Sequence, residues 1–187
     1  MESKIVYFSK PGEQNTDEVL RLAKSRADQL GIKTILVASS TGGTAVKAAE
    51  VFKGLKLVAV SHQAGFQEPN FQEFTEANRK KVEGSGGMVL AATHVLGGIS
   101  GAMRRKFSMY SFPEVVAHTL RFFGQGVKVA CEISVMAADA GLVRTDEDVI
   151  SIAGTDRGAD VALTLRPVNS LNFFDLKIKE ILCKPHF

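Results

Sequence analysis

Short apolar runs alternate with longer amphipathic segments along this chain of 187 residues. The run 34–38 (TILVA) is apolar almost throughout, which is typical of a strand covered on both faces of a sheet. The segment 45–52 after it has its apolar residues at helical spacing. Strands that alternate with helices favour βαβ units. The sequence therefore predicts a three-layer α/β fold, in which a mostly parallel open sheet has helices on both faces.

The same patterns place the remaining elements of this fold. Strands are expected at 5–8, 34–38, 57–60, 88–92, 148–153, 159–165 and 175–183. Helices are expected at 15–30, 45–52, 71–83, 113–123 and 127–140. The last strand alternates apolar and polar residues, so it is expected at an antiparallel edge. Segment 95–112 has no regular pattern and is expected to cover a site. No internal repeat is found, and residues 1–187 are interpreted as one domain.

Composition excludes several classes of partner. The 23 basic and 20 acidic residues give a net charge of +3 without a clustered basic patch, so no nucleic acid partner is expected. No apolar run approaches about 18 residues, so no membrane partner is expected. The chain enters a strand-like run without a signal peptide, which favours a cytoplasmic location. Cys131 and Cys183 lie in apolar stretches and are expected to be buried free thiols. Oligomeric state stays open.

Polar segments follow four of the predicted strands. Ligands of open α/β sheets bind beyond the carboxyl ends of the strands, so these segments are expected to meet in space. The candidate ligand-binding residues are Ser39, Ser40, Thr41, Gly42, Gly43, Thr44, His62, Thr93, His94, Gly154, Thr155, Asp156, Arg157 and Gly158.

The segment 39–44 (SSTGGT) carries the strongest signal. A phosphate group is bound by several N–H donors, by hydroxyl groups and by the partial positive charge of a helix N-terminus, all of which this segment offers. The lysine of GxxxxGK[ST] is missing, and the segment is not GxGxxG, so neither a Walker loop nor the usual dinucleotide site is expected. An ordinary helix cap remains the alternative.

The other segments supply charge and ring nitrogens. Arg157 could clamp a phosphate or stack on a ring, and Asp156 could accept from a sugar hydroxyl, unless both belong to a turn that faces water. His62 and His94 could line the same pocket or be hydrogen-bonded structural residues. No metal-ligand spacing and no GxSxG motif is present, so no metal is expected and the catalytic residues are unknown.

The segment 35–60 (ILVASSTGGTAVKAAEVFKGLKLVAV) resembles the C-terminal domain of pyruvate kinase. The resemblance is carried by Ser39, Thr41, Gly42 and Thr44, in the loop that holds a phosphate of a sugar bisphosphate effector in that domain. Loop 154–158 is similar to a second glycine-rich loop that meets the effector there.

The whole chain resembles a stand-alone archaeal and bacterial family of pyruvate kinase C-terminal domain-like proteins. The segments 126–143 (GVKVACEISVMAADAGLV) and 150–167 (ISIAGTDRGADVALTLRP) carry this resemblance. It implies FMN as the ligand, and hence a flavoprotein of unknown reaction. The catalytic barrel of pyruvate kinase cannot fit in 187 residues, so kinase activity is not expected. The alternative is a non-catalytic sensor or allosteric module that binds a sugar phosphate or nucleotide.

Overall fold

A computed structural model describes residues 3–186 and contains a seven-stranded sheet. The strands follow the order β1-β7-β6-β5-β2-β3-β4 across it. Their bounds are Val6–Phe8 (β1), Thr34–Ala38 (β2), Lys56–His62 (β3), Met88–Ala92 (β4), Val149–Ala153 (β5), Val161–Arg166 (β6) and Lys177–Pro185 (β7). The block β5-β2-β3-β4 is parallel, whereas β6 runs antiparallel to both of its neighbours. The predicted α/β fold class is confirmed. β7 is antiparallel to β6 as expected, but it is not the outermost strand, because β1 pairs with its other side in parallel register.

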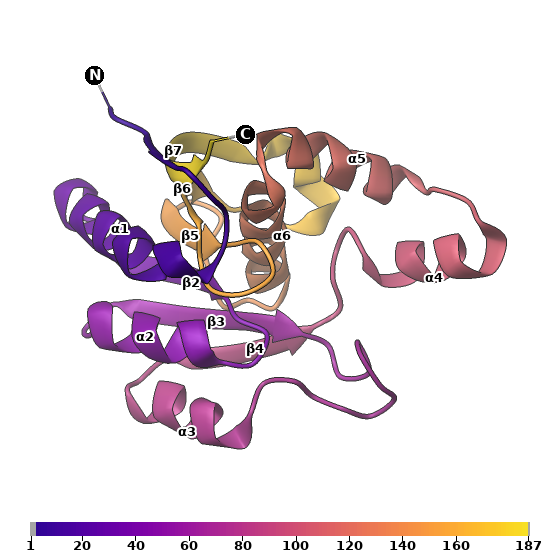
Figure 1. Ribbon diagram of the computed structural model, residues 1–187, viewed down its shortest axis with the longest axis horizontal. Coiled ribbons are helices and arrows are strands. Elements are labelled where there is room, and N and C mark those ends of the chain that lie inside the picture. The colour runs from indigo at the N-terminus through magenta and orange to yellow at the C-terminus, as the bar shows by residue number, and fades with distance from the viewer. Residues whose placement is uncertain (1–2, 187) are drawn as a thin grey trace.

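Helices cover both faces of the sheet (Figure 1). Their bounds are Thr16–Leu30 (α1), Gly43–Val51 (α2), Glu76–Gly84 (α3), Gly98–Phe107 (α4), Phe112–Leu120 (α5) and Gln125–Asp139 (α6). Short 3₁₀ helices lie at Glu13–Asn15 (η1), Arg121–Phe123 (η2) and Ser170–Asp175 (η3). α1, α2 and α3 pack on one face, α6 packs on the other, and α5 lies against α6 and η2. Among residues 3–186, no helix is both long and apolar enough to cross a bilayer.

The two faces of the sheet each bury an apolar core. Because side chains alternate along a strand, Ile35 and Val37 of β2 face α1 and α2, whereas Leu36 between them faces α6. All three side chains are fully buried. This is the physical reason for the unbroken apolar run that predicted a strand covered on both sides.

Three sequence-based expectations about helices are corrected. Segment 95–112 contains the regular helix α4, which projects at the right of Figure 1 and buries none of its residues. Residues 71–75 are not helical, because Thr75 caps α3 and its Oγ1 accepts from Asn78 N at 3.3 Å. The helix expected at 15–30 begins at Thr16, because Asn15 ends η1 and its Nδ2 donates to the carbonyl oxygens of Lys10 and Gly12.

Candidate functional site

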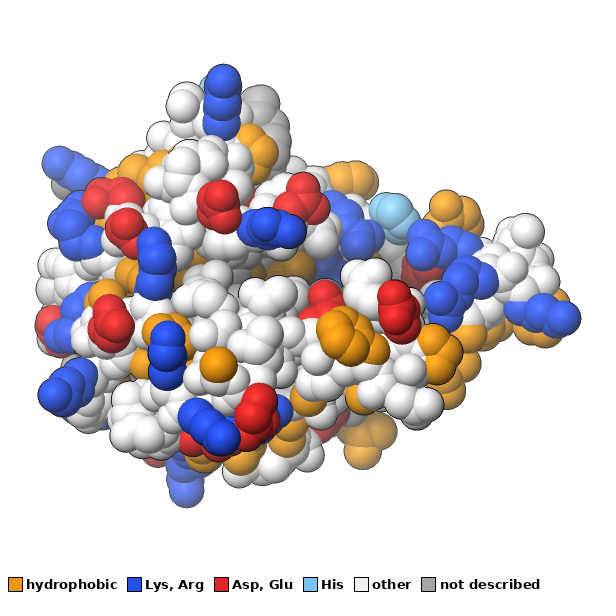
Figure 2. Space-filling model, turned by 60° about the horizontal axis from the view of Figure 1, so that its bottom comes forward, with side chains coloured by type: hydrophobic (Ala, Val, Ile, Leu, Met, Phe, Trp, Pro, Cys, Tyr) orange, Lys and Arg blue, Asp and Glu red, His pale blue; other side chains and the backbone are white. Residues whose placement is uncertain are grey.

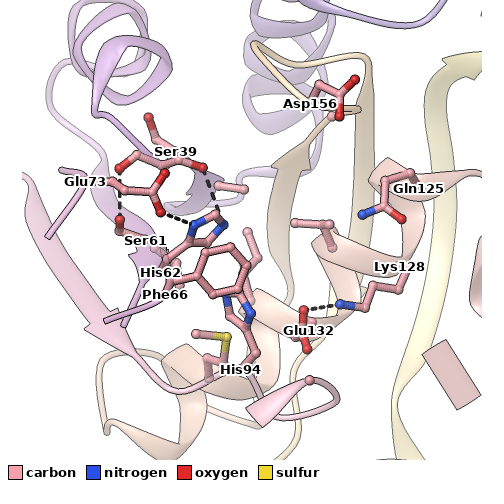
Figure 3. A pocket seen from close by; sticks show the side chains of 18 of the residues that line it. Ser39, Ser61, His62, Phe66, Glu73, His94, Gln125, Lys128, Glu132 and Asp156 are labelled. Carbon is pink, nitrogen blue, oxygen red and sulfur yellow. Dashed lines mark hydrogen bonds and ion pairs between the residues drawn. The ribbon is translucent and has the colours of Figure 1, made fainter. Parts of the chain in front are cut away.

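A cavity of about 1170 Å³ opens at the carboxyl ends of β2, β3, β4 and β5. Loops that are far apart in the sequence meet there, and α6 closes the opposite wall (Figure 3). The sequence-predicted residues that line it are Ser39, Ser40, Thr41, Gly43, Thr44, His62, His94, Gly154, Asp156, Arg157 and Gly158. The expected convergence of the four segments is therefore present in the structure.

Three predicted residues lie outside the lining of this cavity. Gly42 is covered by α3 and by the residues that precede α3, since a Cβ on Gly42 would lie 2.8 Å from Cε1 of Phe74. Thr93 packs beneath Gly98 at the start of α4. Thr155 lines a smaller neighbouring cavity next to Gly12. These three residues therefore contribute to the conformation of the loops, and their side chains are not part of the lining of the main cavity.

The loop between β2 and α2 is held by both of its ends. Ser39 N donates to Val60 O at 3.0 Å, and Ser39 Oγ accepts from Ala45 N at 3.3 Å, so the Ser39 hydroxyl caps α2. On the other side, Thr41 O accepts from Asn78 Nδ2 at 3.0 Å and from Thr75 N at 3.3 Å. The loop is thus anchored through the N–H group and the hydroxyl of Ser39 and through the carbonyl group of Thr41.

The main-chain N–H groups of the same loop remain available. Within residues 3–186, no protein atom accepts a hydrogen bond from the N–H groups of Thr41, Gly42, Gly43 or Thr44. These groups belong to the open N-terminal end of α2, where the helix dipole leaves a partial positive charge. An anion at this end of the cavity would find several donors that need no rearrangement.

Aromatic and imidazole rings form a cluster beside the loop. His62, at the end of β3, has its ring centroid 4.0 Å from that of Phe66 and 4.9 Å from that of His94. His62 Nδ1 lies 2.6 Å from Oε2 of Glu73, and His62 Nε2 lies 3.4 Å from Oγ of Ser40. Burial lowers the pKa of His94, because it disfavours the charged imidazolium.

The wall formed by α6 carries a buried ion pair. Lys128 Nζ contacts Glu132 Oε2, with both side chains almost fully buried, and Glu132 Oε1 accepts from Leu96 N at 2.9 Å. Glu132 therefore ties α6 to the segment that follows β4. Both residues line the cavity, so this wall carries charged side chains, whereas the faces of the sheet are apolar.

Within residues 3–186, six lysine or arginine residues and five aspartate or glutamate residues line the cavity. Lys47 pairs with Asp17 at 2.8 Å, and Arg104 pairs with Glu114 at 3.2 Å. Arg105 and Arg157 also line the cavity, and no carboxylate of residues 3–186 lies within ion-pair distance of either. In Figure 2, blue basic side chains gather with orange apolar ones on the projecting part at the right, where Figure 1 places α4. The opening is suited to an anionic ligand.

The loop 154–158 is clamped against the start of α1. Asp160, which is fully buried, accepts from Thr155 N at 3.1 Å and from Gly12 N at 2.9 Å. A Cβ on Gly158 would lie 2.4 Å from Cα of Glu13, so only glycine fits there. This packing presents Asp156 and Arg157 to the cavity. Across residues 3–186, no group of three or more histidine, cysteine, aspartate or glutamate side chains is arranged to hold a metal ion.

Sequence reasoning missed several residues that line the cavity. Phe66 lies in a polar loop and Glu73 in a segment that was expected to be helical, and nothing in the sequence indicates that either one reaches His62. Lys128 and Glu132 are four residues apart, a spacing that exposed helices also use, so only the burial of α6 distinguishes them.

Comparison with known proteins relates most of the chain to one domain type. The family described as "Pyruvate kinase, alpha/beta domain" matches residues 17–164. Among solved structures, a pyruvate kinase from Cryptosporidium parvum is 14% identical with a TM-score of 0.45, covering 82% of this chain and 23% of its own. The Cryptosporidium parvum enzyme in complex with ADP is 15% identical with a TM-score of 0.44, covering 82% and 24% respectively. The matched part of this chain thus corresponds to about a quarter of those enzymes.

Proposed function

The chain belongs to the pyruvate kinase alpha/beta-domain family, and we propose that it binds a phosphorylated small molecule, with FMN as the leading candidate. The observation that carries this proposal is the set of unbonded N–H groups of Thr41, Gly43 and Thr44, three residues that line the cavity at the N-terminus of α2. A dianionic phosphate there would accept hydrogen bonds from these N–H groups, and the dipole of α2 would stabilise its negative charge.

The rest of the cavity suits a ligand with a planar ring. Phe66, His62 and His94 offer aromatic surfaces on one side, and Leu96 and Met136 contribute apolar surface. The volume of about 1170 Å³ is large enough for a ligand of the size of FMN, since small-molecule sites usually measure about 300–1,000 Å³. FMN itself is suggested by the resemblance of the whole chain to the stand-alone family.

Loop 154–158 would supply the contacts between phosphate and ring. Asp156 can accept from hydroxyl groups of a ribityl chain, and the Arg157 guanidinium can donate to phosphate oxygens or stack on a ring. Both side chains line the cavity, and the hydrogen bonds of Asp160 hold their loop in place.

A sugar bisphosphate or a nucleotide in a non-catalytic sensor is the second candidate. The guanidinium groups of Arg105 and Arg157, which have no carboxylate partner among residues 3–186, favour it, because they offer a second anion site beyond the N-terminus of α2. FMN carries one phosphate and leaves part of this positive charge uncompensated.

Spectroscopy and calorimetry distinguish the two candidates. We expect flavin absorbance bands in the purified protein, or binding when FMN is added to the apoprotein. A protein without flavin bands that gives no heat with FMN, but binds a sugar bisphosphate, would replace FMN by the second candidate. Absence of binding to FMN, to a sugar bisphosphate and to a nucleotide would refute the proposed function.

The substitution Gly43→Asp tests the position of the phosphate. A Cβ on Gly43 meets no atom within 4 Å, and an aspartate in the first turn of a helix is compatible with the dipole, so the fold is expected to persist. The added carboxylate would repel the phosphate, and we expect affinity to fall at least about 100-fold, roughly 2.7 kcal/mol. Gly84→Asp is the matched control, because Gly84 also has open space around it and lies at the end of α3, away from the cavity. Equal affinities of the two variants would show that the phosphate binds elsewhere.

A further inference from the structure

We propose that Ser40, His62 and Glu73 form a nucleophilic triad that cleaves a carboxylic ester bound in the cavity. The three residues come from the β2–α2 loop, the end of β3 and the loop that precedes α3. Figure 3 shows His62 and Glu73 turned toward one another, and Ser40 Oγ lies on the other side of the His62 ring, near Nε2. Triads of a hydroxyl, an imidazole and a carboxylate recur on unrelated folds and are recognised by geometry, so the absence of a GxSxG motif does not exclude one.

The carboxylate orients the imidazole. Glu73 Oε2 lies 2.6 Å from His62 Nδ1, and the Glu73 side chain is only 15% exposed. A carboxylate can only accept, so Nδ1 carries the proton in this contact and Nε2 presents its lone pair. The ring of Phe66 packs against His62 and limits its rotation.

Nε2 of the same ring faces the hydroxyl of Ser40. The distance from Ser40 Oγ to His62 Nε2 is 3.4 Å, a separation that shortens to a hydrogen bond with a small change of the serine rotamer. Among residues 3–186, Ser40 Oγ has no other hydrogen-bond partner, whereas the neighbouring Ser39 hydroxyl caps α2. Ser61 Oγ donates to Ser40 O at 3.1 Å and holds the Ser40 backbone in place.

The loop also offers donors for a developing negative charge. The N–H groups of Thr41, Gly43 and Thr44 are unbonded within residues 3–186, and these residues line the cavity directly after Ser40 in the chain. Donors of this kind stabilise the oxyanion of an acyl-transfer intermediate. Arg105 and Arg157, which line the same cavity without a carboxylate partner in that range, favour an ester that carries an anionic group.

The reaction is a two-step hydrolysis. Ser40 Oγ attacks the ester carbonyl carbon while its proton moves to His62 Nε2, and the carbonyl oxygen becomes an oxyanion. The oxyanion collapses, the C–O bond to the alcohol breaks, and the alcohol leaves with the proton from Nε2. Water then attacks acyl-Ser40, gives its proton to Nε2, and releases the carboxylic acid as Ser40 recovers the proton.

Covalent labelling tests the triad without a known substrate. We expect a fluorophosphonate probe to form one adduct per chain, located on Ser40 by peptide mass spectrometry, and p-nitrophenyl acetate to release p-nitrophenol. Ser40→Ala should abolish both signals, and Ser25→Ala, which removes an exposed serine of α1, should change neither. Wild-type protein without an adduct on Ser40, or Ser40→Ala that hydrolyses the ester at the wild-type rate, would overturn the proposal.

The roles of His62 and Glu73 need separate readouts. We expect His62→Ala to slow labelling at least about 100-fold, the loss typical for a general base. Glu73→Gln should lower the maximal labelling rate at least about tenfold while leaving the half-saturating probe concentration unchanged, because Glu73 positions the imidazole without touching the probe. Ser40→Cys should restore labelling, now by iodoacetamide, only while His62 is present. If Glu73→Gln labels at the wild-type rate, Glu73 has no positioning role and the triad is refuted.

This inference uses the same loop as the proposed phosphate site but does not depend on it. If both hold, FMN or inorganic phosphate should slow labelling of Ser40 in the wild-type protein. Labelling of Ser40 in a protein that binds none of the phosphate ligands tested would refute only the proposed function, and ligand binding without labelling would refute only the triad.

Discussion

Phe74 packs directly over Gly42, so that a Cβ on Gly42 would lie 2.8 Å from Cε1 of the ring. Gly42 also has φ 96°, in the region where side chains are strained. We therefore expect Gly42→Ala to lower the free energy of unfolding by about 2–4 kcal/mol, from backbone strain and overpacking together. Urea denaturation followed by circular dichroism measures this change.

Gly43→Ala is the matched control for that substitution. Gly43 begins α2 at a negative φ and has open space where its Cβ would be, so alanine should leave stability unchanged or raise it by up to about 1 kcal/mol. If Gly42→Ala and Gly43→Ala unfold at the same urea concentration, Phe74 does not pack on Gly42 as described. Substitution of Gly42 thus tests the packing of the loop, whereas Gly43→Asp, at the neighbouring position, tests the binding of the phosphate.

Periodicity was sufficient to predict the strands and the mostly parallel class of the sheet, but not the place of β1 beside β7 at its edge. The apolar run 34–38 and its alternation between the two cores follow from the physics of a buried strand, and the location of the cavity follows from the rule for parallel sheets. Helix α4 was missed, because Gly97, Gly98 and Gly101 lower helix propensity and the helix buries none of its residues, so no apolar face marks it.

The partners of His62 could not be predicted in the same way. Glu73 reaches it from a non-helical loop whose path depends on tertiary contacts, such as the hydrogen bond from Gln72 Nε2 to His62 O at 3.1 Å. No spacing rule connects residues on such a loop with the end of a strand. Sequence therefore indicated which strand ends would meet, but not which side chains complete the cluster.

Arg26 of α1 and Glu180 of β7 join the helix layer to the sheet. Arg26 Nε donates to Glu180 Oε2 at 2.8 Å, and both side chains are largely buried. The hydrogen bond from Arg26 lowers the pKa of Glu180 below its usual value of 4.5. A lowered pKa means that the pair stabilises the fold above pH 4.5 and that this contribution is lost as pH falls through the lowered pKa.

We expect Glu180→Gln to reduce the free energy of unfolding by about 1–3 kcal/mol at neutral pH. The difference from wild type should shrink as the pH falls below 4.5, because protonated Glu180 no longer forms the ion pair. Urea denaturation at a series of pH values measures this, with Glu83→Gln on the exposed surface of α3 as the control. A difference that stays constant down to acidic pH would contradict the role assigned to the ion pair.

Both cysteines are buried free thiols, as predicted from their apolar surroundings. Burial raises the pKa of each thiol to about 12, so almost no thiolate exists at neutral pH. We expect iodoacetamide to leave Cys131 and Cys183 unmodified in the native protein and to alkylate both in concentrated urea. Intact-protein mass spectrometry reads the result directly, and rapid alkylation of the native protein would show that the core around either residue opens readily.

The buried carboxylate of Asp160 holds two separate segments of the chain together. Its Oδ2 accepts from Gly12 N and Thr155 N, and it has no exposed surface, so the side chain joins the segment before α1 to the loop that presents Arg157. Asp160→Ala would leave both N–H groups without this acceptor, and we expect a loss of about 2–5 kcal/mol in the free energy of unfolding. Asp160→Asn keeps one oxygen acceptor and should cost less than half as much. Hydrogen exchange should accelerate at Gly12 and Thr155 in the alanine variant, while residues of β3 that lie far from Asp160 serve as the internal reference. Unchanged exchange at both amides would mean that other contacts hold the loop, such as the hydrogen bond from Ala159 N to Thr16 Oγ1 at 3.0 Å.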